Sequence, residues 1–199
     1  MCYRAAQVLG ASLVLLLASG SGRPQESQPS EYQVKAAFLF NFAKFVEWPP
    51  TAYAEPTSPI VIGILGENPF GDDLERTIRG KTVNNRPFAI KEIRSLPGAT
   101  NCHILFISTS EKKRFSEIFE GLRGVGVLTV GETERFVETG GMINFVKDAN
   151  RIRFQINDDA AKGAGLKISS KLLSLAQIVR GTGEMKATSS QLTLPDERA

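Results

Sequence analysis

Short apolar runs bounded by turn-forming residues recur through the first two thirds of the chain, and stretches with helical periodicity separate them. Two runs, 59–65 and 104–107, are apolar without interruption, which is typical of strands buried on both faces of a sheet, and one, 88–93, alternates. Strands are expected at residues 59–65, 88–93, 104–107 and 126–130, and helices at 68–79 and 110–122. Because a helix between two strands makes a parallel crossover, this order predicts a doubly wound sheet.

A first helix is expected at residues 31–47, where the pair Pro49-Pro50 then stops it. The apolar stripe of this segment is wider than one packing contact requires. Phe40 and Trp48 are therefore candidates for a second contact, with a partner protein or with another copy of the chain. The alternative is that both side chains are buried between the sheet and neighbouring helices.

The pattern changes after residue 140. Segments 142–146 and 152–156 both alternate and are joined by a short polar connection, which predicts an antiparallel hairpin. Asn144, Arg153 and Gln155 are expected to point outward from it. One face of the hairpin should therefore be polar.

A closing helix is expected at residues 166–179, where the apolar side chains share one face and Gly181 provides a stop. Together the elements predict a single three-layer α/β domain over residues 31–181. Its mainly parallel sheet carries a C-terminal antiparallel hairpin and is flanked by helices. The remaining residues, 182–199, are rich in Gly, Ser, Thr and charges, and we expect a disordered tail.

The N-terminal segment predicts export. Residues 1–22 combine Arg4 with an apolar run at 8–18 and a cluster of small residues, the layout of a cleaved secretory signal peptide. The run is only about half of the roughly 20 residues that span a bilayer, so membrane insertion is not expected. A polar linker, 23–30, connects the signal to the domain.

Composition and charge exclude several classes of protein. The hydrophobic share of 42% and charged share of 23% are those of an ordinary globular domain, not of a disordered chain. The chain has 24 basic and 21 acidic residues without a clustered basic stripe. Nucleic-acid binding is not expected, because counterion release needs such a stripe.

The candidate catalytic and metal-binding residues are few. His103 is the only histidine, and Cys102 is the only cysteine after the predicted signal. Both lie at the start of an apolar strand, without a nucleophile elbow or a second pair of metal ligands nearby. We expect a buried Cys102, a core or loop position for His103, and no catalytic residues, metal or cofactor. For Cys102 the alternative is an exported thiol that pairs between chains.

Charged residues near the hairpin and the last helix could hold an anionic or zwitterionic ligand. These residues are Arg151, Arg153, Asp158 and Lys171. The alternative is a solvated polar face. A different ligand site, for an exported solute-binding protein or enzyme, would lie in the loops at 66–68, 108–110 and 131–132, because ligands of doubly wound sheets bind at the carboxyl ends of the strands.

Several motifs, in the same order, resemble the YfiR family of exported bacterial proteins. The first runs from Glu31-Tyr32-Gln33-Val34-Lys35 to Trp48-Pro49, and the second is Val127-Leu128-Thr129-Val130-Gly131-Glu132. The third runs from Gly140-Gly141-Met142-Ile143-Asn144-Phe145 through Asn150-Arg151-Ile152-Arg153-Phe154, and the fourth is Ala164-Gly165-Leu166-Lys167-Ile168-Ser169-Ser170-Lys171-Leu172-Leu173. The resemblance covers residues 31–181.

The resemblance implies a periplasmic regulator without catalytic activity. The namesake represses an inner-membrane diguanylate cyclase by binding its periplasmic part, and an outer-membrane lipoprotein relieves the repression by sequestering it. By that likeness the chain would act as a negative regulator in cyclic di-GMP signalling and biofilm control. A homodimer is a further expectation. The namesake carries disulfides, whereas this chain would keep one cysteine after export, so redox control is not carried over.

Overall fold

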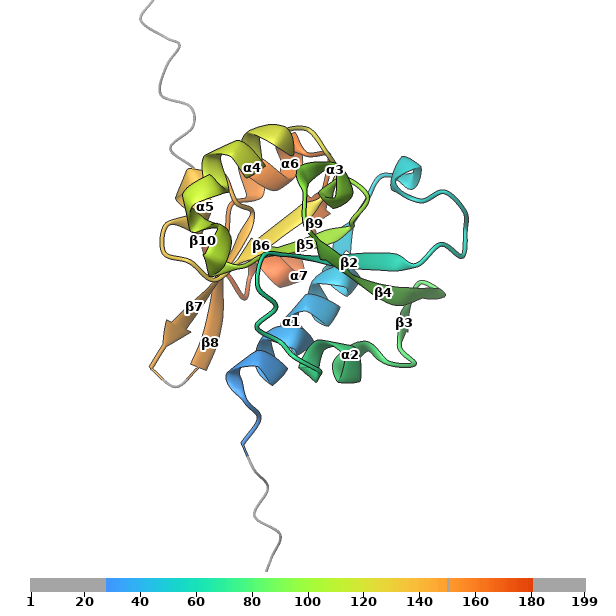
Figure 1. Cartoon of the computed structure of the whole chain (residues 1–199), viewed down its shortest axis with the longest axis horizontal. Coiled ribbons are helices and arrows are strands. Elements are labelled where there is room, and N and C mark those ends of the chain that lie inside the picture. Colours follow the sequence, from blue (N-terminus) through green and yellow to red (C-terminus); the bar gives the residue numbers. More distant parts are fainter. Residues whose placement is uncertain (1–27, 150, 181–199) are drawn as a thin grey trace, which may run out of the picture.

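The structure, a computed structural model, describes residues 28–149 and 151–180 (Figure 1). The predicted signal peptide, most of the linker and the predicted tail lie outside the described residues. The predicted first helix is present as α1, Glu31–Phe45, but it ends two residues earlier than expected, because Val46 and Glu47 form a strand. Ser30 caps the helix: its hydroxyl accepts the amide N–H of Gln33 at 3.1 Å, and the Gln33 side chain accepts the N–H of Ser30 at 2.9 Å.

The main sheet has eight strands in the order β10-β8-β7-β6-β5-β2-β4-β3. Strands β4, β2, β5, β6 and β7 run parallel, β8 and β3 pair antiparallel to their neighbours, and β10 is parallel to β8. The bounds are β2 Ile60–Leu65, β3 Thr82–Val83, β4 Arg86–Ile93, β5 Ile104–Ile107, β6 Leu128–Gly131, β7 Ile143–Asp148, β8 Arg151–Ile156 and β10 Gln177–Ile178. The four strands predicted between residues 59 and 130 are all present.

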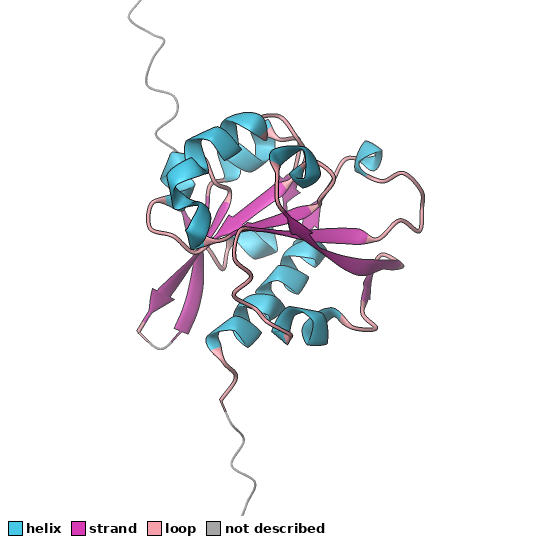
Figure 2. Cartoon of the chain, in the orientation of Figure 1, coloured by secondary structure: helices cyan, strands magenta, loops and turns pink. Residues whose placement is uncertain are grey.

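Helices cover both faces of this sheet, which makes the predicted three layers (Figure 2). On one face α1 and α2 pack over Ile62 and Ile64, and on the other α3, α4 and α5 pack over Leu65 and Leu105. All six residues of β2 are buried because the strand lies between these two layers. The remaining helical bounds are η1 Pro50–Ala52, α2 Asp73–Ile78, α3 Leu96–Ala99, η2 Thr109–Arg114, α4 Phe115–Gly121, α5 Phe136–Thr139 and α6 Asp158–Gly163.

Strands β7 and β8 form the predicted antiparallel hairpin, in which Phe145 lies opposite Phe154. Arg153 is exposed and Gln155 is half-buried. The expectation for Asn144 was wrong, because this side chain is only 2% exposed. Its neighbours Ile143 and Phe145 point toward α1, so Asn144 points to the opposite face of the sheet, which α5 covers.

The single helix predicted at residues 166–179 is also wrong. The segment contains strand β9 at Lys167–Ile168, the one-turn helix α7 at Ser170–Leu173 and strand β10. Strand β9 pairs antiparallel with β1 (Val46–Glu47) in a second, two-stranded sheet. Backbone groups of this segment are satisfied by pairing with β1 and with β8 instead of within one helix.

Candidate functional site

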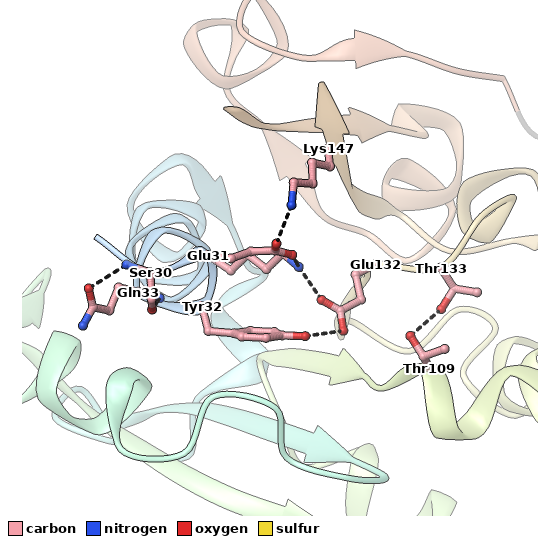
Figure 3. Close-up of polar contacts among 9 residues, drawn as sticks. Ser30, Glu31, Tyr32, Gln33, Thr109, Glu132, Thr133 and Lys147 are labelled. Carbon is pink, nitrogen blue, oxygen red and sulfur yellow. Dashed lines mark hydrogen bonds and ion pairs between the residues drawn. The ribbon is translucent and has the colours of Figure 1, made fainter. Parts of the chain in front are cut away.

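The loops at the carboxyl ends of the parallel strands meet at one edge of the sheet, as their order predicted. The backbone N–H of Glu67, after β2, donates to the Ser110 hydroxyl at 3.0 Å. The hydroxyls of Thr109, after β5, and Thr133, after β6, are 3.2 Å apart (Figure 3). These groups therefore bond to one another across the loops and hold the edge together.

A cluster of charged side chains lies at the same edge, between α1 and β6 (Figure 3). The ammonium of Lys35 donates to Glu132 at 2.6 Å and to Glu31 at 2.5 Å. The Tyr32 hydroxyl donates to the other Glu132 oxygen at 3.3 Å, and Lys147 from β7 reaches Glu31 at 3.4 Å. One turn of α1 is thus tied to the end of β6 and to the hairpin.

The central ion pair of this cluster is largely buried. Lys35 is 4% exposed, and the Glu132 side chain is 12% exposed. Burial lowers the pKa of Lys35, but the bonds to Glu132 and Glu31 outweigh it and raise the pKa above its ordinary value. The bond from Lys35 also lowers the pKa of Glu31. A lysine held charged in this way is a poor nucleophile or base, so the geometry favours positioning of α1 rather than catalysis.

The two predicted contact residues lie in different surroundings. Phe40 is half-buried on α1, with its ring centroid 5.5 Å from that of Phe88. The ammonium groups of Lys81 and Lys44 lie 4.8 Å and 5.6 Å from the same ring centre. Trp48 is only 9% exposed, and its indole N–H donates to the His103 carbonyl at 3.1 Å. Trp48 is therefore buried, which was the alternative interpretation, whereas part of the Phe40 side chain remains accessible.

Cys102 and His103 are both buried directly before β5; burial was expected for Cys102, and His103 takes the core position of the two expected for it. The Nδ1 atom of His103 accepts the backbone N–H of Val61 at 3.0 Å, and its ring stacks on Tyr53 with centroids 4.6 Å apart. Burial lowers the pKa of His103, although the Ala52 carbonyl favours the protonated ring. Burial raises the pKa of the Cys102 thiol to about 11. Both groups are therefore neutral at physiological pH.

The four predicted anion-site residues have separate contacts. Arg153 pairs with Asp148 at 2.7 Å, and Asp158 in the first turn of α6 pairs with Lys162 at 2.6 Å. Lys171 lies 5.4 Å from the centre of the Phe45 ring, and Arg151 is exposed. Within the described residues no ion pair joins any two of the four, and a ligand site at these residues stays a prediction.

The described part of the chain brings no three His, Cys, Asp or Glu side chains into an arrangement that could hold a metal ion. Within the same residues, no helix has the length and apolar character needed to cross a membrane.

A protein-family model described as YfiR/HmsC-like matches residues 32–177, which is nearly the whole described domain. The chain belongs to the YfiR/HmsC-like family. Membership of this family supports a general role as a periplasmic regulator of diguanylate cyclase signalling. Two motifs on which the resemblance rested supply Lys35 and Glu132, the partners of the buried ion pair. Sequence reasoning placed each residue in its segment but missed the pair, because no local pattern connects them.

Among solved structures, a similar chain is the ABC domain from Streptococcus pneumoniae, whose crystal structure is of a complex with L-Trp. The identity is 12% and the TM-score is 0.43, over 60% of this YfiR/HmsC-like chain and 56% of that chain. The chain thus spans little more than half of that protein. A similarity of this size carries no argument about function.

Proposed function

We propose that this protein is an exported repressor that binds the periplasmic part of an inner-membrane diguanylate cyclase and so lowers cyclic di-GMP. The observation that supports the proposal is the family match over residues 32–177. The buried ion pair fits a binding role, because it fixes α1 on the domain without offering a reactive group. Export would follow from the signal peptide predicted at residues 1–22.

The contact surface that we propose is the outer side of α1 around Phe40, with Lys44 and Lys81. An aromatic ring flanked by two ammonium groups offers a partner an apolar anchor with a cationic rim. Such a surface suits a partner that presents an apolar side chain beside carboxylates.

The test is the cellular cyclic di-GMP concentration in a strain deleted for the protein, compared with the same strain complemented by the exported chain. We expect the concentration to rise on deletion and to return on complementation. The Phe40→Asp variant should fail to restore it, whereas Leu175→Asp should succeed. Leu175 is a matched control, because it is an exposed apolar residue, 66% exposed, outside α1.

Two outcomes would contradict the proposal. An unchanged cyclic di-GMP concentration on deletion would remove the repressor function. Restoration by Phe40→Asp, with the variant folded by circular dichroism, would remove the α1 surface. Co-purification with the periplasmic parts of the membrane cyclases of the same cell would then identify or exclude a direct partner.

A further inference from the structure

A cavity of about 620 Å³ lies between α2 and the edge strands β4 and β3. It arises because α2 has only six residues and is too short to cover the outer part of the sheet. Phe88 and Ile90 of β4 face this side of the sheet and stay half-buried. Figure 1 shows α2 and β4 on the two sides of this region.

The lining has an apolar floor. It is formed by aliphatic and aromatic side chains from three elements, namely Ile64, Leu74, Ile78, Phe88 and Ile90. The volume lies within the range of about 300 to 1,000 Å³ that is usual for small-molecule sites. An apolar group placed there would leave water and gain favourable transfer free energy.

The charged part of the lining favours an anion. It contains two cations, Arg79 and Lys81, and one acid, Glu75. Arg79 is 70% exposed and pairs with Glu75 at 3.1 Å, so its remaining donors face solvent. The ammonium of Lys81 rests near the face of Phe40 and has no carboxylate partner within the described residues. With two cations and one acid, the lining has an excess of positive charge that favours a carboxylate.

We infer that this cavity binds a small amphipathic carboxylate, with its apolar tail on the floor and its carboxylate between Arg79 and Lys81. The apolar tail supplies most of the affinity, since exposed ion pairs contribute little each. The carboxylate supplies selectivity against neutral molecules of the same shape. This binding goes beyond the proposed regulatory function and does not depend on it.

The test uses the chain without its predicted signal, residues 23–199, and decanoate as the probe, titrated by calorimetry below its micellar concentration. We expect saturable binding with one site per chain and at least tenfold weaker binding of decanol, which has the same tail without the charge. The double variant Arg79→Ala, Lys81→Ala should raise the dissociation constant for decanoate about tenfold. The matched control Lys112→Ala, Lys113→Ala on η2 should leave it within twofold.

A second variant tests the floor. Ile90→Trp fills the cavity while both cations stay in place, and it should abolish decanoate binding without loss of the thermal unfolding transition. Absence of saturable binding, equal affinity for decanol, or unchanged binding by either the double variant or Ile90→Trp would overturn the inference. None of these results alters the outcome of the cyclic di-GMP experiment, so the two proposals fail separately.

Discussion

The ammonium of Lys35 lies 2.6 Å from the carboxylate of Glu132, although 97 positions separate the two residues in the chain. The pair joins the first helix to the end of a central strand, and Tyr32 and Glu31 complete the bonding of both charges. A buried charge costs free energy unless it is paired, so each partner requires the other. The position of α1 on the sheet is therefore sensitive to either residue.

Removal of one partner of this pair should destabilise the domain strongly. We expect Lys35→Met to lower the free energy of unfolding by about 3 kcal/mol, because Glu132 would keep a charge without its main partner. The double variant Lys35→Met, Glu132→Gln should recover part of that loss, since no uncompensated charge remains. Urea titration followed by circular dichroism measures all three proteins, with Lys113→Met as the control.

Lys113 is exposed on η2, and its replacement should change the free energy by less than about 0.5 kcal/mol. A loss for Lys35→Met no larger than that of this control would mean that the ion pair does not hold α1.

The sheet was predictable from the sequence because its strands carry their own signal. The uninterrupted run Ile60–Leu65, short and bounded by turn residues, is typical of a strand buried on both faces, and the hairpin alternates on both of its strands. Asn144 shows the limit of that reasoning. The alternation correctly separated it from Ile143 and Phe145, but which face of the hairpin is solvated depends on α5, a distant element.

The C-terminal segment and the charged cluster depended on contacts that no local pattern encodes. Ile168, Leu172 and Leu175 have helical spacing, yet Ile168 pairs with Val46 in a strand and Leu175 is exposed. Two-residue strands are too short to leave a period in the sequence. Likewise, Lys35 has the spacing of any surface lysine on a helix, and only the fold brings Glu132 to it. The motifs marked both residues without revealing their contact.

The Cys102 thiol should be unreactive in the folded protein. Its pKa is raised to about 11 and it is 4% exposed, so at pH 8 almost none of it is the thiolate that reacts. In the chain without residues 1–22, Ellman's reagent should label it slowly under native conditions and completely in urea. The exposed control Ser116→Cys, made with Cys102→Ala, should react within the mixing time. Rapid native labelling of Cys102 would contradict its burial.

The protein should lose stability as the pH falls below the ordinary pKa of histidine. Burial lowers the pKa of His103 in the folded state, so near pH 6.5 and just below it the unfolded chain binds a proton that the folded chain does not. The contribution of His103 is therefore complete above pH 6.5 and falls as the pH drops toward the folded pKa. Urea titrations at pH 7.5, 6.5 and 5.5 measure this trend.

A loss of stability between pH 7.5 and 5.5 can be assigned to histidine titration at one position, because His103 is the only histidine in the sequence. His103→Asn keeps a side-chain acceptor for the Val61 N–H and removes the titration. Its free energy of unfolding should vary less across the same three pH values, whatever its absolute stability. An equal slope in both proteins would assign the pH dependence to carboxylates instead.

The ring of Phe136 should leave room for no residue larger than glycine at positions 131 and 141. A Cβ atom added at Gly131 or at Gly141 would overlap ring atoms of Phe136, which is fully buried against Phe115 with centroids 5.2 Å apart. We expect Gly131→Ala and Gly141→Ala each to lower the free energy of unfolding by about 1 to 3 kcal/mol, because a packed ring cannot move without displacing its neighbours. Thermal unfolding measures the loss.

The control for these glycines is Gly163→Ala, where an added Cβ meets nothing within 4 Å. Its stability should stay within about 0.5 kcal/mol of the parent. Phe136→Leu should reduce the additional cost of Gly131→Ala, since the smaller side chain leaves room for the methyl group. Both glycines fall within the motifs that mark the family, so their presence there would follow from the packing of one phenylalanine. If Gly131→Ala were as stable as Gly163→Ala, that explanation would be wrong.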